Sequence, residues 1–171
     1  MAVLDILKFP DPMLKGKARP ITRIDDDIRQ LARDMAQTMY SAPGVGLAAP
    51  QVGRPVRLIV VDVMSGQNGG DLRTLINPEI VRSEGETVFE EGCLSVPDVR
   101  EEITRAGSVT VKALDLDGNE VSIEAEDLFA IVLQHEIDHL NGILFIDRLS
   151  KLKQGLIKKK LKKAQANADA L

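Results

Sequence analysis

The sequence predicts an α+β fold in which antiparallel or mixed strands surround a buried central helix, with an N-terminal helix and a C-terminal helix. Apolar residues recur at helical spacing over 25–41 and 126–141, and β-type patterns fall between those two segments. The length of 171 residues and the 44% hydrophobic composition fit one compact domain with a core of its own. Strands in the middle and helices at both ends are typical of this class.

The first elements follow from prolines and apolar spacing. Residues 1–23 hold three prolines and are expected to form an irregular lead-in. A helix is expected from about 25 to 41, with Asp25 or Asp26 as its N-cap. The glycines and prolines of 43–53 then predict an extended or turning segment.

The middle of the chain carries the strand signals. The apolar, β-branched run 56–63 predicts a buried strand, and 65–71 predicts a loop. Residues 72–81 predict a second strand region that is broken at Pro78. Residues 108–125 alternate on both sides of an Asp-Gly pair and predict a hairpin. Its "DLDGN" faintly resembles a calcium loop, but the later ligands of such a loop are missing, which favours a plain turn.

Residues 126–141 give the strongest helix signal, and Gly142 is expected to end that helix. A second set of apolar residues covers another side, so the helix is expected to be buried. One face is shared by Leu128, Ile131, Val132, His135 and His139.

The charge of the chain is unevenly distributed. Residues 151–171 carry seven lysines and one aspartate, whereas the body of the chain is acidic. We therefore expect a catalytic or binding domain over 1–150 and a basic C-terminal helix or tail over 151–171. The lysines fit either a solvated helix face or electrostatic contact with RNA.

Composition limits the compartment. Cys93 is the only cysteine, which excludes an intrachain disulfide and suggests a reducing environment. No apolar run approaches the roughly 18 residues of a membrane span, so no membrane partner is expected. The N-terminal segment lacks the features of a secretory or transit signal, and a cytoplasmic protein is expected.

The segment "LQHEIDHLNG" (133–142) contains both histidines of the chain, His135 and His139. Side chains four residues apart on a helix lie on one face and can bind one cation, while Glu136 is turned aside, where it can accept a proton from water. The competing interpretation is a chance H-E-x-x-H with ordinary hydrogen-bonded histidines. The predicted burial disfavours it, because these polar groups are costly to bury without a task.

A third metal ligand is available at Cys93. A catalytic metal site uses about three protein ligands and one open position, and the chain has no third histidine. The competing interpretation is a buried structural thiol, the usual state of a free cysteine. The glycine, serine and proline around Cys93 instead indicate a loop or strand edge, where a ligand can approach the backbone.

Three segments together resemble the peptide deformylases. "GVGLAAPQ" (44–51), "EGCLS" (91–95) and "QHEIDHLNG" (134–142) stand in the order of that family and roughly at its spacing. The opening "ILKFPDPMLKGKARPI" and "INPEI" (76–80) are similar as well. The resemblance covers about residues 3–150.

The resemblance implies a role for each motif residue. One divalent metal would be bound by Cys93, His135 and His139. Glu136 would be the general base, and the Gln51 amide and the Leu94 backbone N–H would hold the oxyanion. The substrate-binding residues would be Val45, Gly46, Phe89, Glu91, Arg100, Leu128, Ile131 and Val132.

The same resemblance implies the reaction and its partners. The enzyme would remove the N-formyl group from the N-terminal formyl-methionine of nascent polypeptides and release formate. Fe(II) would be the native ion, with zinc, nickel or cobalt able to replace it, and all four accept a Cys-His-His donor set. Ribosomal RNA would be the partner of the basic tail, and a monomer is expected.

Two rival functions remain at this level. A general zinc peptidase would use the same H-E-x-x-H chemistry on internal peptide bonds. A structural metal site in an RNA-binding module would need no base, and Glu136 therefore speaks against it.

Overall fold

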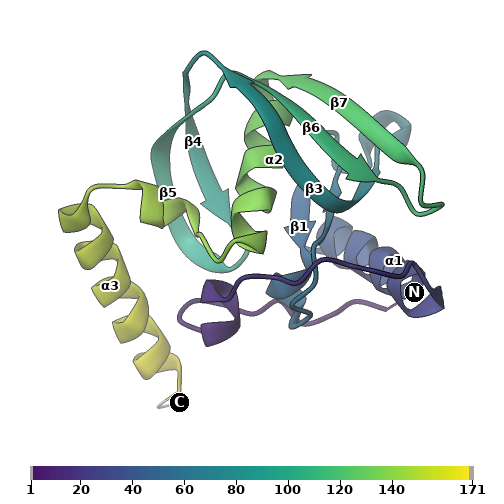
Figure 1. Cartoon of the computed structure of the whole chain (residues 1–171). Helices are drawn as coiled ribbons and strands as arrows, with labels where there is room; N and C mark the ends of the chain where they lie inside the picture. Colours follow the sequence, from purple (N-terminus) through teal and green to yellow (C-terminus); the bar gives the residue numbers. More distant parts are fainter. Residues whose placement is uncertain (1, 170–171) are drawn as a thin grey trace.

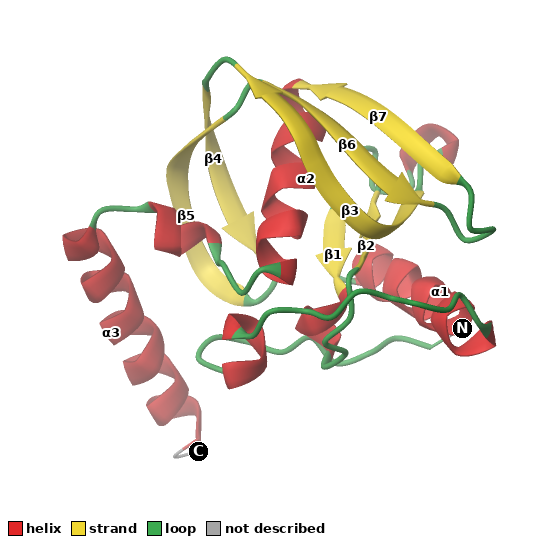
Figure 2. Ribbon diagram, viewed as in Figure 1, coloured by secondary structure: helices red, strands yellow, loops and turns green. Residues whose placement is uncertain are grey.

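The computed structural model describes residues 2–169, so the last two residues of the predicted tail lie outside the described residues. A five-stranded sheet of order β1-β2-β3-β6-β7 and a two-stranded sheet β4-β5 stand on different sides of helix α2 (Figures 1 and 2). All pairings between these strands are antiparallel. The predicted α+β class, with strands around a central helix, is confirmed.

The strands are β1 (Gly46–Ala48), β2 (Leu58–Val61), β3 (Arg73–Glu84), β4 (Thr87–Cys93), β5 (Val96–Arg105), β6 (Ser108–Leu114) and β7 (Glu120–Glu126). The α-helices are α1 (Asp26–Ser41), α2 (Asp127–Leu140) and α3 (Lys151–Asp169). Short 3-10 turns are η1 (Pro12–Lys15), η2 (Ala49–Val52), η3 (Gln67–Gly69) and η4 (Phe145–Arg148).

The two helices expected from periodicity form where the sequence places them. The Asp25 side chain accepts a hydrogen bond from the Ile28 N–H and caps α1, as predicted. Helix α2 is buried on most of its sides and packs against the inner face of the large sheet through Leu133, Ile137 and Leu140. The expected hairpin is β6–β7, joined at the Asp-Gly turn.

The prediction that the second strand breaks at Pro78 is wrong. Strand β3 runs through this point, and the pairing with β6 shifts register between Ile76 and Glu79. Asn77 takes a positive φ of 52° there, and its side-chain amide bonds both the N–H and the C=O of Ile21. A bulge absorbs the missing N–H of the proline, so the ladder resumes after it.

Gly142 ends α2 at a very tight contact. It has a φ of +75°, and a Cβ at this position would collide with the carbonyl of Lys15. Only glycine meets both demands without strain. The lead-in segment therefore crosses directly over the end of α2, and the Ala18 N–H donates to the C=O of Leu140 beside it.

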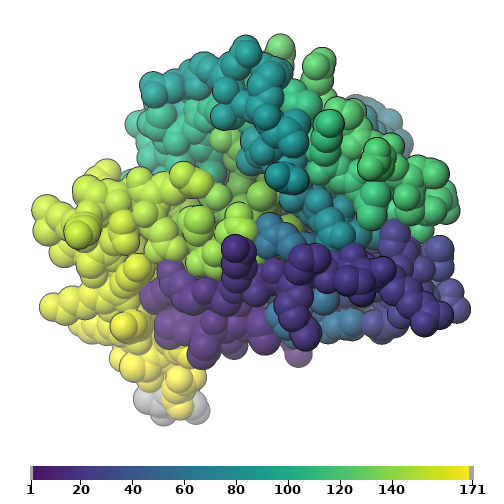
Figure 3. Space-filling view, viewed as in Figure 1, coloured from purple at the N-terminus to yellow at the C-terminus, as the bar shows by residue number. Residues whose placement is uncertain are grey.

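Helix α3 projects from one side of the molecule (Figure 3). Leu161 is its one buried residue within 151–169, and it joins a small cluster with Phe145 and Ile146. Two of its lysines reach the body, Lys153 toward Glu101 at 3.4 Å and Lys158 toward Asp147 at 3.3 Å. Among residues 2–169, neither this helix nor any other combines the length and apolar character of a bilayer span.

Candidate active site

A cleft of about 510 Å³ opens between β1, β4, the segment after β4 and helix α2. Thirteen of the fourteen predicted site residues line it, and His139 lies just behind Cys93. Its wall combines the edge of β1 around Gly46, the end of β4 at Cys93, and two turns of α2. The cleft thus brings together three segments that are distant in the sequence.

Cys93, His135 and His139 meet at one point. One ligand atom from each of them lies within 4.8 Å of the others. The Cys93 Sγ lies 3.3 Å from the His139 Nε2, and the two imidazole centroids are 5.0 Å apart. The histidines occupy successive turns of α2, and Cys93 arrives from the end of β4 after a register shift beside Glu91. This geometry fits one ion with three protein ligands and an open position.

The two histidines of this group differ in their electrostatics. Burial lowers the pKa of His139 well below its ordinary value, which keeps this imidazole neutral and able to bind a metal. Burial also acts to lower the pKa of His135, but hydrogen bonds to Cys93 and Glu91 outweigh it and raise that pKa. The two imidazoles therefore differ, because His139 favours its neutral form and His135 its charged form.

Glu136 is buried beside this point. The residue is 4% exposed, and its Oε1 has no hydrogen-bond partner among the described residues. Burial raises its pKa to about 7, although His135 and Arg105 act in the opposite direction. A carboxyl with a pKa near neutrality can both take and return a proton.

Glycine at position 46 gives Glu136 its space. A Cβ on Gly46 would stand 2.6 Å from the Glu136 Oε2, well inside van der Waals contact. Strand β1 therefore approaches the carboxylate closely because it has no side chain there.

The Gln51 amide is held by two partners. Its Oε1 accepts from the Ala48 N–H at 2.9 Å, and its Nε2 donates to the Ser95 Oγ at 3.0 Å. The same Nε2 lies 3.7 Å from the Cys93 Sγ, so its second N–H faces the metal-binding groups. Ser95 is fully buried and was not predicted as a site residue. Its place two residues after Cys93 was the only signal for it.

Glu91 lies at the cleft, but its carboxylate is engaged elsewhere. Oε1 accepts from the His135 Nδ1 at 3.0 Å and from the Arg105 Nη2 at 2.9 Å, and Oε2 accepts from the Arg105 Nε at 2.6 Å. Burial opposes its ionisation, yet the bonds from His135 and Arg105 lower the pKa of Glu91 below its ordinary value. Breaking a buried pair of this kind by removing one partner typically costs about 3–5 kcal/mol.

Asp138 and Arg148, two charged residues that were not predicted from the sequence, extend this contact. Arg105 also donates from Nη1 to the Asp138 Oδ2 at 2.9 Å. Arg148 donates one hydrogen bond to each Asp138 carboxylate oxygen, from Nε and Nη2, both at 2.7 Å. Asp138 lies inside the H-E-x-x-H motif, next to His139.

The rest of the cleft is mostly apolar and partly open. Phe89 and Leu128 are 42% and 37% exposed, which is unusual for large apolar side chains and leaves them available to a ligand. The other apolar lining residues from the prediction are Val45, Ile131 and Val132. Arg100 is exposed at the rim and pairs with Glu90 at 3.2 Å.

The loop 65–71 supports the first motif from behind. The Ser65 Oγ donates to the carbonyl of Gly44 at 2.8 Å, and the Asp62 N–H donates to the carbonyl of Val45 at 2.9 Å. The buried Asp62 carboxylate accepts from three backbone N–H groups and from the Tyr40 hydroxyl. The loop is therefore tied to the segment that lines the cleft.

The chain is similar to known proteins over nearly its whole length. The family model described as polypeptide deformylase matches residues 3–155. A peptide deformylase of Thermodesulfovibrio yellowstonii is 53% identical over 95% of this chain and 98% of its own length. One of Mesorhizobium japonicum is 50% identical over 95% and 93%, respectively.

Solved structures agree with these sequence matches. A peptide deformylase from Legionella pneumophila superposes with a TM-score of 0.91 at 47% identity, over 98% of each chain. A peptide deformylase from Ehrlichia chaffeensis, in complex with actinonin, gives a TM-score of 0.90 at 41% identity, over 96% of this chain and 98% of that one.

Proposed function

This chain belongs to the peptide deformylase family, and from that premise we propose that the cleft around Cys93, His135 and His139 is its active site. The protein is a metal-dependent hydrolase that acts on N-formyl-methionine peptides and releases formate. The observation that carries the site assignment is the meeting of three ligand atoms within 4.8 Å beside a buried glutamate and an oriented amide.

Cys93, His135 and His139 would hold one divalent ion. We propose Fe(II) as the native ion, with zinc, nickel or cobalt as functional replacements, since imidazole and thiolate donors accept all four. When bound, the ion supplies Lewis acidity, which makes water easier to deprotonate and polarises a carbonyl. Cys93 distinguishes this donor set from that of a zinc peptidase built on H-E-x-x-H with a third histidine or a glutamate.

Glu136 moves the proton in the proposed reaction. Its carboxylate accepts a proton from the attacking water and later delivers it to the amine of the departing peptide. The C–N bond of the formamide breaks as a C–O bond forms, so the products are formate and a free N-terminus. The buried site and the raised pKa of Glu136 suit both transfers.

Gln51 and Leu94 stabilise the charge that develops on the formyl oxygen. The Gln51 N–H that faces the Cys93 Sγ and the backbone N–H of Leu94 would donate to this oxygen, and one such donor is typically worth about 3 kcal/mol. The Ser95 and Ala48 contacts support this role, because they leave the Gln51 amide only one orientation.

The methionine side chain would occupy the apolar part of the cleft. Gly46 would bond the substrate backbone, and Arg100 at the rim would lie near the path of the peptide. Glu91 was predicted as a substrate-binding residue, but its bonds to His135 and Arg105 support a role behind the ligand instead. The proposed lining of the methionine pocket is Val45, Phe89, Leu128, Ile131 and Val132.

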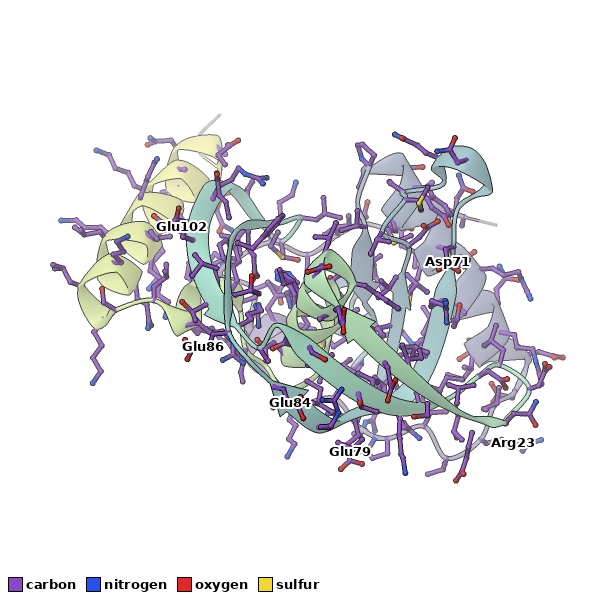
Figure 4. The ribbon with its side chains drawn as sticks, turned by 90° about the horizontal axis from the view of Figure 1, so that it is seen from above. Arg23, Asp71, Glu79, Glu84, Glu86 and Glu102 are labelled. Atoms are coloured by element: carbon purple, nitrogen blue, oxygen red, sulfur yellow. The ribbon has the colours of Figure 1, made fainter. Side chains whose placement is uncertain are left out.

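We also propose that α3 contacts ribosomal RNA. Its seven lysines lie on a helix that projects from an acidic body, and Figure 4 shows Glu79 and Glu84 on strand β3 of that body. Phosphate neutralisation by lysines gives salt-dependent affinity without sequence specificity. The corresponding division is a catalytic domain over 1–150 and a basic C-terminal helix or tail over 151–171, in a cytoplasmic monomer.

Formate release from a formyl-Met peptide tests the site assignment. Glu136→Ala should keep the metal and lose at least about 100-fold in turnover, whereas Cys93→Ala should lose the metal. The metal content is measured on protein purified without oxygen. Full turnover by the Glu136 variant would refute the base assignment, and a tightly bound ion in the Cys93 variant would refute the ligand set. An unformylated peptide is the control, because a general peptidase would cleave inside both.

A further inference from the structure

Four charged residues of alternating sign form a chain that ends on His135. In order they are Arg148, Asp138, Arg105 and Glu91, and they come from η4, α2, β5 and β4, respectively. Every link is a hydrogen-bonded ion pair of 2.9 Å or less, and the last contact joins the Glu91 Oε1 to the His135 Nδ1 at 3.0 Å. We call this set the charged relay.

Burial makes the charged relay unusual. The side chains of Arg105, Glu91 and Asp138 are 2%, 4% and 10% exposed, and only that of Arg148 reaches solvent, at 41%. Burying ion pairs seldom stabilises a fold more than apolar residues of the same volume would. Stability alone therefore gives a weak reason for these residues to stand here.

Each residue of the relay orients the next one, and the series ends at the His135 imidazole. An imidazole whose Nδ1–H donates to a carboxylate has its Nε2 free as a metal ligand, so the Glu91 contact selects the tautomer and the ring orientation. Arg105 holds both oxygens of Glu91 in a two-pronged contact, and its remaining Nη1 is held by Asp138. Arg148 in turn holds both oxygens of Asp138. Each forked contact removes rotational freedom from the next residue toward His135.

We propose that Arg105, Asp138 and Arg148 are positioning residues, which fix Glu91 on the Nδ1 of His135 and thereby hold that imidazole in place for the metal ion. The outermost of them, Arg148, lies three residues before α3 begins, outside the cleft and away from any substrate. The inference rests on the metal site proposed above.

Metal affinity, measured apart from turnover, tests the proposal. Apoproteins of the wild type and of Arg105→Met, Asp138→Asn and Arg148→Met are titrated with zinc against a competing chelator. We expect the affinity for zinc to fall by about 10–100-fold for Arg105→Met and roughly threefold for Arg148→Met, with Asp138→Asn between them. The visible spectrum of the cobalt-loaded proteins should shift in the same order, because it reports ligand geometry.

Arg82→Met is the matched control. Arg82 is 38% exposed, bonds Thr110 and Ser108, and pairs with Glu84 at 2.9 Å, far from the cleft on β3. It therefore loses as many contacts as Arg148→Met without touching the relay. Arg148→Lys separates charge from geometry, because lysine keeps the positive charge but cannot form the forked contact. It should weaken zinc binding nearly as much as Arg148→Met does.

The outcomes are distinct. Wild-type zinc affinity in all three relay variants, with only their melting temperatures lowered, would overturn the proposal and leave the relay as a structural feature. Tighter zinc binding by Arg148→Met would overturn it too, since that is what loss of a repelling charge alone predicts. If Arg105→Met fails to fold, the partly exposed Arg148 still decides. Absence of zinc binding in the wild type would refute the ligand set itself.

Discussion

Helices α2 and α3 both carry several charged residues, but those near the cleft on α2 are buried and those on α3 are mostly exposed. Ten of the 14 residues of α2 are buried, among them His135, Glu136, Asp138 and His139, whereas α3 has one buried residue within its 19. On α2, His135 and Asp138 are held by charged side chains of β4 and β5, respectively. On α3 most lysines extend into solvent. A change in the first should therefore alter catalysis, and a change in the second should alter contact with an outside partner.

Gly46→Ala should give the largest effect, because it acts on the most crowded point of the α2 region. The new Cβ would stand 2.6 Å from the Glu136 Oε2 and displace that carboxylate. A misplacement of this size can reduce kcat/KM by about 100-fold. Formate release measures the loss, and metal content should stay at one ion per chain. An alanine variant with wild-type turnover would show that Glu136 has more room than this contact allows.

Ser95→Ala, which also changes the cleft beside α2, should reduce turnover less than Gly46→Ala does. It removes the acceptor that orients the Gln51 Nε2, a hydrogen bond worth about 1 kcal/mol, so kcat should fall roughly fivefold to tenfold. KM for a formyl-Met peptide should change little, because Ser95 is buried behind the amide. Steady-state kinetics separate the two constants, and a loss confined to KM would contradict the orienting role.

Neutralising α3 should leave the chemistry unchanged. Lys159, Lys160, Lys162 and Lys163 make no ion pair with a carboxylate among residues 2–169, so their joint replacement by glutamine keeps the contacts of Lys153 and Lys158 with the body. Ribosome binding should weaken by ~10-fold at moderate salt and lose part of its salt dependence. Activity on a short peptide should remain within about twofold. Equal ribosome affinity before and after the change would argue for the solvated-face interpretation.

Gly155→Ala should give the smallest effect, and it is the control for Gly46→Ala because it makes the same substitution at an uncrowded position. No atom lies within 4 Å of a Cβ at Gly155, which is exposed on α3. Alanine should stabilise this helix by about 0.5–1 kcal/mol through propensity alone. Circular dichroism should show unchanged or slightly higher helicity, with formate release unaltered. Reduced activity would mean that α3 and the cleft are coupled more strongly than their contacts indicate.

The parts of the fold that sequence predicted are those with local causes. Helices α1 and α2 and the hairpin β6–β7 each have a periodicity, a cap or a turn residue of their own. Strands β4 and β5 escaped prediction, because their sequence is rich in glutamate and lacks a clean alternation. The break expected at Pro78 was wrong since a bulge, which depends on the partner strand, accommodates the proline.

The site residues likewise fall into those that sequence motifs predict and those that only the fold brings together. The predicted site residues could be named from resemblance, and all of them except His139 line the cleft. Arg105, Asp138 and Arg148 could not, because a buried ion pair joins residues that have no fixed spacing in the chain. Ser95 sat inside a recognised motif, but only the fold revealed which amide it holds.

Because the cleft is assembled from distant segments, it can form only at a certain stage of the synthesis of the chain. Gln51, Cys93 and His139 belong to three separate stretches, and the lead-in closes over the end of α2 at Gly142. A growing chain that has not passed residue 139 lacks the second histidine, and one that has not passed 148 lacks the outer end of the charged relay. With Cys93, His135 and His139 as the proposed ligands, the metal site therefore cannot be complete before residue 139 has been synthesised. By the same reasoning, a chain that ends before residue 139 can be a substrate of a peptide deformylase but cannot act as one.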